Sequence, residues 1–139
     1  MGHPPRAERE ETMVRFTWEH VHLRSPDPEA TAQWYHDKLG ADVIRTKNAD
    51  GSTRIDLNLA GQKVFIAKAE PSKAAAAPSS PYMGLDHFGM TVEDMDSAVA
   101  ELKAKGVVFT MEPTQIRPGT KIAFLTAPQN VSIEILQRD

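Results

Sequence analysis

The chain has 139 residues, of which 40% are hydrophobic and 25% are charged, a composition typical of one small globular domain and not of a disordered, collagen-like or coiled-coil chain. It contains no cysteine, so disulfide bonds, a thiolate nucleophile and cysteine-bound zinc are excluded. The formal net charge of -3 gives no basic footprint for nucleic acid, and no apolar run approaches the ~20 residues of a membrane span. We therefore expect a cytoplasmic protein with neither of these partners.

The first 15 residues combine prolines with charges and show no apolar periodicity. They also lack the apolar stretch of a secretory signal. We predict a disordered N-terminal extension over residues 1–15, followed by a single domain over residues 16–139.

The domain contains an internal repeat. Residues 19–24 align with residues 86–91, which places His20 over His87, and Asp27 then falls on Asp94. Each Asp is a suitable helix N-cap, and each helical stretch that follows stops at a glycine, Gly40 or Gly106. The repeat therefore predicts two matching helices.

The strand-like segments complete the same unit twice, as one strand, one helix and three strands. We predict repeat 1 over residues 16–70, a Pro/Ala/Ser-rich linker over residues 71–82, and repeat 2 over residues 83–139. The predicted strands cover residues 16–24, 42–47, 53–59, 63–69, 85–92, 107–111, 121–126 and 131–137. The fold class is α+β.

These motifs resemble the vicinal oxygen chelate superfamily, also described as glyoxalase/bleomycin resistance/dioxygenase proteins. The resemblance is carried by residues 19–28, 34–40, 85–92, 123–128 and 132–136. It implies two βαβββ modules that form a curled mixed sheet around a metal-binding cleft, in a homodimer. Whether the site lies within one chain or across the dimer interface is left open.

The resemblance further implies that His20, His87 and Glu134 bind one divalent metal ion. Two imidazoles and a carboxylate suit Fe, Mn, Zn, Ni or Co and leave positions for substrate. The lyase branches of the family add a fourth ligand on the last strand of the first repeat. The repeat places that ligand at Ala67, which cannot bind metal.

The mechanistic hypothesis assigns proton transfer to His22, Asp56 or Glu134. We predict Glu134, His22 and Asp56 as catalytic residues, since His22 lies on the same strand face as His20. Asp56 shares a strand face with Arg54, so a structural ion pair is the alternative for that carboxylate.

The predicted function is that of a metal-dependent lyase or isomerase, acting through a metal-chelated enediolate of a small substrate with vicinal oxygens. One alternative is an extradiol-type dioxygenase with a His-His-Glu triad, although Phe124 stands where ring-cleaving relatives commonly carry a tyrosine. The other is a metal-free ligand-binding protein of the bleomycin-resistance type. The fosfomycin-type thiol transferases share the triad, but their potassium-binding loop is not apparent in residues 116–121.

Overall fold

The computed structural model describes Gly2 and residues 14–139. The predicted extension over residues 1–15 therefore lies outside the described residues, apart from Gly2, Val14 and Arg15. Among the described residues, no helix is long and apolar enough to cross a membrane.

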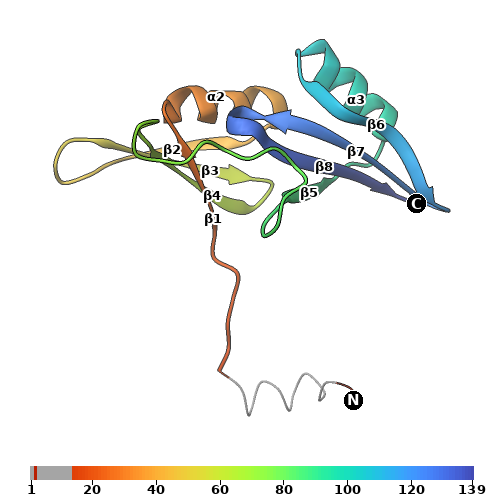
Figure 1. Cartoon of the computed structure of the whole chain (residues 1–139), viewed down its shortest axis with the longest axis horizontal. Coiled ribbons are helices and arrows are strands. Elements are labelled where there is room, and N and C mark those ends of the chain that lie inside the picture. The colour runs from red at the N-terminus through yellow and green to blue at the C-terminus, as the bar shows by residue number, and fades with distance from the viewer. Residues whose placement is uncertain (1, 3–13) are drawn as a thin grey trace.

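The chain forms two modules of the same topology (Figure 1). The first contains β1 (Val21–Ser25), α2 (Pro28–Leu39), β2 (Asp42–Lys47), β3 (Thr53–Leu59) and β4 (Gln62–Lys68). The second contains β5 (His87–Thr91), α3 (Met95–Ala104), β6 (Val108–Arg117), β7 (Thr120–Ala127), the short turn η1 (Pro128–Asn130) and β8 (Val131–Arg138). Their strand orders are β1-β4-β3-β2 and β5-β8-β7-β6. In each sheet the first strand runs parallel to the last, and the other neighbours are antiparallel. The predicted α+β fold with two βαβββ modules is confirmed.

The two helices begin in the same way. Asp27 accepts a hydrogen bond from the Ala30 N–H, and Asp94 accepts one from the Ser97 N–H. Each carboxylate satisfies an N–H group that has no partner within its helix. Gly40 then ends α2 in the left-handed conformation, at a φ of 73°, which costs a glycine no steric strain.

Both helices cover the same side of the sheets (Figure 1). Alternate strand residues are buried beneath them in one continuous core; they include Leu57, Val64, Leu125, Ile133 and Ile135. Because side chains alternate across a strand, the residues between these positions lie on the opposite face. That face carries every predicted metal ligand.

The sheets lie side by side but stay separate. Each has four strands, and β1 and β5 are both edge strands with one hydrogen-bonded neighbour. A single chain therefore does not form the continuous curled sheet that the resemblance implies.

Two predicted strand boundaries differ most from the structure, while several others differ by one or two residues. Strand β1 begins at Val21 and not at residue 16, because its only neighbour, β4, begins at Gln62 and provides no backbone partner for residues 16–18. Strand β6 continues to Arg117 instead of ending at residue 111. Register shifts on either side of Pro113, which has no N–H to donate, let β6 stay paired with β7 although its side-chain alternation is broken.

Candidate functional site

The second module brings two predicted metal ligands together. His87 opens β5, and Glu134 lies on β8, one pleat beyond the residue paired with His87. Nε2 of His87 is 3.3 Å from Oε1 of Glu134. Both side chains are partly buried, at 33% and 18% exposure.

Asp86 orients the ring of His87. Its Oδ2 lies 2.8 Å from Nδ1 of His87, and it also accepts hydrogen bonds from the Ser80 hydroxyl and the Tyr82 N–H. The hydrogen bonds from His87, Tyr82 and Ser80 lower the pKa of the Asp86 carboxyl. Asp86 is therefore an ionised acceptor, and Nδ1 carries the proton that it receives.

This geometry fits a metal ion. A neutral imidazole that donates from Nδ1 has its lone pair on Nε2, so it can face the Glu134 carboxylate only with a proton or a cation between them. Two atoms that each bind one ion at about 2.0–2.2 Å stand roughly 3–3.5 Å apart, which matches the observed spacing. A carboxylate that orients a metal-binding histidine is a common arrangement around such ions.

Gly89 lies beside Glu134 on the neighbouring strand. The two residues are direct partners across β5 and β8. A Cβ at Gly89 would lie 3.2 Å from the Leu136 side chain and 3.8 Å from Oε1 of Glu134. Such a Cβ would crowd Leu136 first, while its distance to Oε1 of Glu134 is that of ordinary van der Waals contact.

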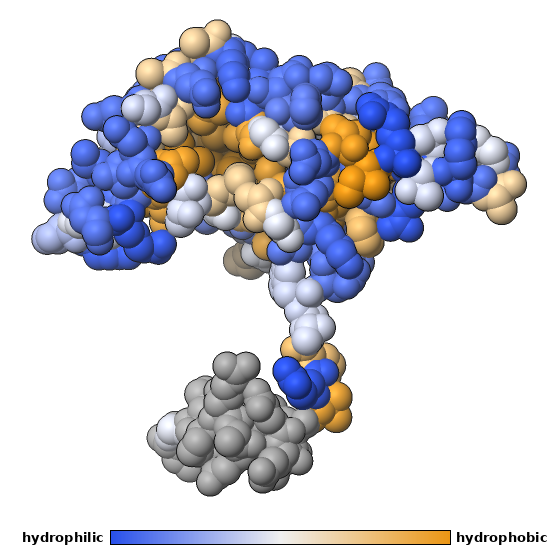
Figure 2. Space-filling model, turned by 180° about the vertical axis from the view of Figure 1, so that it is seen from behind, coloured by the Kyte–Doolittle hydropathy of each residue, from blue (hydrophilic) through white to orange (hydrophobic). Residues whose placement is uncertain are grey.

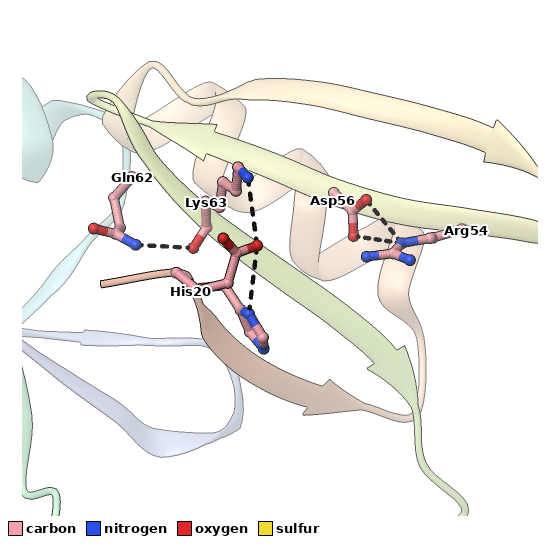
Figure 3. A network of polar contacts seen from close by, with 6 residues as sticks. His20, Arg54, Asp56, Gln62 and Lys63 are labelled. Carbon is pink, nitrogen blue, oxygen red and sulfur yellow. Dashed lines mark hydrogen bonds and ion pairs between the residues drawn. The ribbon is translucent and has the colours of Figure 1, made fainter. Parts of the chain in front are cut away.

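The first module has a different arrangement around His20. The ring of His20 stacks on Phe65, with centroids 4.0 Å apart and planes at 26°. The Arg54 guanidinium lies 4.5 Å from the centroid of the same Phe65 ring. Glu19 is 4.0 Å from Nδ1 of His20 and also pairs with Lys63 (Figure 3).

The strand register corrects the position of the missing fourth ligand. His20 stands to Phe65 as His87 stands to Glu134, because in each module the acid position lies one pleat beyond the partner of the histidine. The counterpart of Glu134 is therefore Phe65, and not Ala67 as the sequence spacing predicts. One residue of this two-residue difference arises because the β3–β4 turn, residues 60–61, is one residue shorter than the turn over residues 128–130. The other arises before the turn, since the partner of Phe65 is Asp56 and the partner of Glu134 is Phe124. Neither Phe65 nor Ala67 has a side chain that can bind a metal. The corrected register therefore also gives no fourth ligand on β4 at the position equivalent to Glu134.

The two remaining predicted catalytic residues lie on the face that carries His20. Asp56 forms an ion pair with Arg54, with Nε of Arg54 2.9 Å from Oδ2 (Figure 3). The structure therefore contains the Arg54–Asp56 ion pair that was given as the alternative to a catalytic role for Asp56. The ring of His22 lies 6.2 Å from that of His20, and both line a groove of about 800 Å³ together with Arg54 and Phe65.

The predicted triad is divided between the modules. Within residues 14–139 and Gly2, no three His, Asp or Glu side chains are close enough to hold one metal ion together. His87 and Glu134 form a pair in the second module, while His20 lies in the first. Among the described residues, His20 therefore does not join the His87–Glu134 pair in one cluster.

Sequence reasoning missed Asp86 and Phe65 as neighbours of the histidines. A signal for Asp86 was present, since an acidic residue precedes each histidine in the repeat, Glu19 before His20 and Asp86 before His87. No comparable signal marked Phe65, because its place beside His20 depends on strand register.

A model of the Glyoxalase/Bleomycin resistance protein/Dioxygenase superfamily matches residues 17–135, which include His20, His87 and Glu134. The chain belongs to this superfamily.

Relatives in sequence and structure agree with this assignment. The chain is 29% identical to the uncharacterized protein YwkD of Bacillus subtilis, over 86% of this chain and 94% of that protein. It is 27% identical to a probable lactoylglutathione lyase of Synechocystis, over 85% of this chain and 92% of that protein. The crystal structure of a glyoxalase family protein from Enterococcus faecalis matches with a TM-score of 0.70 and 25% identity, over 87% of this chain and 97% of that one. The fosfomycin resistance protein FosX of Listeria monocytogenes shares the fold, with a TM-score of 0.70 and 14% identity, over 91% of this chain and 96% of that one.

Proposed function

We propose that this protein is a divalent-metal-dependent lyase or isomerase that acts on a small substrate with vicinal oxygens. The observation that carries the proposal is the His87–Glu134 pair, whose spacing suits a shared cation and whose histidine is oriented by Asp86. Similarity to a probable lactoylglutathione lyase supports the lyase class.

The metal site is completed between two chains. His20 of one chain joins His87 and Glu134 of the other, which accounts for the separation of the ligands within one chain. Two-fold pairing of identical chains then gives two equivalent sites. Members of this superfamily often form dimers, in agreement with this arrangement.

When bound, the ion would polarise two neighbouring substrate oxygens and stabilise the negative charge that develops when an adjacent carbon loses its proton. Glu134 and His22 are the groups proposed to take and return that proton, since His22 faces the groove beside His20. Asp56 has a smaller part in proton transfer, because it is engaged by Arg54. The Arg54–Asp56 pair and Phe65 hold one wall of the groove beside His20.

The first test is the metal content of anaerobically purified protein, measured by elemental analysis. We expect about one divalent ion per chain in the wild type, loss of that ion in His20→Ala and in His87→Ala, and no change in His36→Gln. His36 is a suitable control because it lies on α2 and contacts the backbone oxygen of Ala41. Absence of metal after reconstitution would contradict the proposal and favour the metal-free binding protein.

A mixing experiment tests the shared site. His20→Ala and His87→Ala chains each lack one ligand, but a mixed dimer regenerates one intact site. Random exchange of the two variants should restore about a quarter of the wild-type sites. Failure of the exchanged mixture to bind metal would place the site within one chain.

The identity of the bound metal and the reaction that the protein catalyses distinguish a lyase or isomerase from a dioxygenase. Nickel, cobalt or zinc with isomerisation or cleavage of a substrate with vicinal oxygens supports the lyase or isomerase. Iron or manganese with oxygen uptake on a catechol would instead establish the dioxygenase.

A further inference from the structure

A pocket of about 410 Å³ in the second module is lined mainly by uncharged polar side chains. The side chains that carry a hydroxyl or an amide are Ser79, Ser80, Thr110, Thr126, Asn130 and Ser132. Hydroxyl and amide groups can each donate and accept hydrogen bonds without adding charge to a site. Within the part of the chain that the structure describes, the pocket lining includes no lysine, arginine or histidine.

Two contacts connect this pocket with His87. Asp86 lines the pocket, and its Oδ2 is 2.8 Å from Nδ1 of His87. Phe124 also lines the pocket, and the centroid of its ring is 4.9 Å from that of His87. A ligand that reaches the His87–Glu134 pair can therefore extend into the pocket.

Strand register places two of the hydroxyls in a row with His87. Ser132 on β8 is the register partner of His87, and Thr126 on β7 is the register partner of Ser132. Register partners share a face of the sheet, and neighbouring strands are about 5 Å apart. Measured from β5, the two hydroxyl-bearing strands therefore follow at about 5 Å and about 10 Å. A short carbon chain that carries hydroxyl groups can hydrogen-bond to Ser132 and then to Thr126.

Hydrogen bonds within the protein hold the linker as one wall of the pocket. The side-chain amide of Asn130 donates to Oγ of Ser79 at 3.0 Å, and the Ser80 hydroxyl donates to Asp86 at 2.8 Å. The two hydroxyls of the strand row take no part in these contacts. The wall is therefore built without using the groups that the row presents to a ligand.

The pocket differs from two other hollows of the molecule. Arg54 and Lys68 are among the residues that line the groove beside His20. Val64, Phe88 and Met90 line an apolar hollow of about 470 Å³ between the modules. Hydrophobic residues also line the depression on the face that Figure 2 shows. Uncharged hydrogen-bonding groups therefore distinguish the pocket beside His87 from the groove and from the apolar hollow.

We infer that this pocket binds an uncharged, hydroxyl-bearing carbon chain, so that the substrate is a small polyhydroxylated carbonyl compound of the sugar type. Ser132 and Thr126 hydrogen-bond its hydroxyl groups, while Phe124 and Met111 contact its carbon atoms. A phosphate or carboxylate in the same place would face the Asp86 carboxylate without a cation in the pocket lining. The inference rests on the proposed function, because the metal pair receives the vicinal oxygens of the same molecule.

Two compounds with the same carbon skeleton test the pocket. Erythrulose and 1-hydroxy-2-butanone are both four-carbon hydroxyketones, and only erythrulose has hydroxyl groups on the two carbons beyond the ketone. NMR chemical-shift titration of the protein, as purified and after zinc loading, measures both affinities. We expect erythrulose to bind at least about tenfold more tightly, because it alone can hydrogen-bond to the row.

Three variants locate the effect. Thr126→Val and Ser132→Ala each remove one hydroxyl, and each should weaken erythrulose binding about tenfold while leaving 1-hydroxy-2-butanone unaffected. The matched control is Thr114→Val, which removes an exposed hydroxyl of β6 that donates to the backbone oxygen of Glu112. It should change neither affinity. Circular dichroism of each variant shows whether the fold is retained.

The outcomes separate this inference from the proposed function. Equal affinity for the two compounds, or no binding of either, overturns the inference, as does a folded Thr126→Val and Ser132→Ala double variant that binds erythrulose normally. Metal binding by the same protein would then still support the proposed function. Selective erythrulose binding that both substitutions weaken, in a protein that takes up no metal, supports the pocket while the proposed function fails.

Discussion

The two modules share a backbone plan but differ around their histidines. In the second module, His87 faces Glu134 at 3.3 Å, is oriented by Asp86 at 2.8 Å, and has Gly89 two residues later on its strand. In the first module, the corresponding positions hold His20, Phe65, Glu19 and His22. There the histidine stacks on an aromatic ring, and its acidic neighbour is 4.0 Å away.

The difference shows that the repeat preserved the fold and divided the chemistry. The second module keeps a histidine and a carboxylate in geometry suited to one ion, while the first supplies a single histidine held against Phe65. The stacked ring fixes the orientation of His20 without adding a charge to the site. Four substitutions test this comparison, the first of which removes the distinctive feature of the second module.

Glu134→Gln should have the largest effect. An amide keeps the size of the side chain but loses the negative charge that an ion between Nε2 of His87 and Oε1 of Glu134 requires. We expect metal affinity to fall by more than about a hundredfold and activity to be lost with it. Isothermal titration with the metal measures the loss, and Glu112→Gln, an exposed carboxylate paired with Lys103, is the control. Unchanged affinity would remove Glu134 from the site.

Asp86→Asn should weaken metal binding by about 10–100-fold, because the amide no longer fixes the ring and tautomer of His87. The Asp86 pKa is below its ordinary value of 3.8 in the folded protein, mainly through the hydrogen bond from His87. Such a group stabilises the fold above its unfolded pKa, and this stability is lost as the pH falls through the folded pKa.

Unfolding measured against pH provides a check on the same residue. The wild type should lose stability below about pH 4, and Asp86→Asn should lack this part of the decrease. Identical acid profiles in the two proteins would contradict the role of Asp86 in the fold.

Phe65→Glu should make the first module resemble the second. The carboxylate would stand beside His20 in the register that Glu134 has beside His87. We expect divalent metal to bind about tenfold more tightly, through a fourth protein ligand. Phe65→Leu is the control, because it removes the aromatic stack without adding a ligand, and chelator competition gives both affinities. Weaker binding by Phe65→Glu than by Phe65→Leu would count against the equivalence of Phe65 and Glu134.

Tyr35→Phe should have the smallest effect. Tyr35 on α2 corresponds to Leu102 on α3, and both are buried. The Tyr35 hydroxyl is buried without a hydrogen-bond partner among the described residues, and burial raises its pKa. Its removal should increase the free energy of unfolding by about 1 kcal/mol, measured by urea denaturation. A decrease of that size would show that the hydroxyl has a partner.

Much of the fold could be predicted from sequence, because its signals are local. The repeat, the Asp27 and Asp94 caps and the apolar alternation of β3 depend on residues close together in the chain. The boundaries of β2 and β3 were predicted without error for the same reason. The early end of the β1 ladder was not predicted, since it depends on where β4 begins.

The candidate site likewise has features that local sequence signals predict and features that depend on residues distant in the chain. The amino-acid sequence by itself determined the two-module fold and indicated His20, His87 and Glu134, because their residue types and their places in the repeat can be read along the chain. Only the tertiary structure decided which of them meet. It paired His87 with Glu134 and Asp86, stacked His20 on Phe65, and kept the two sheets apart, because strand register and sheet closure arise from contacts between residues distant in sequence.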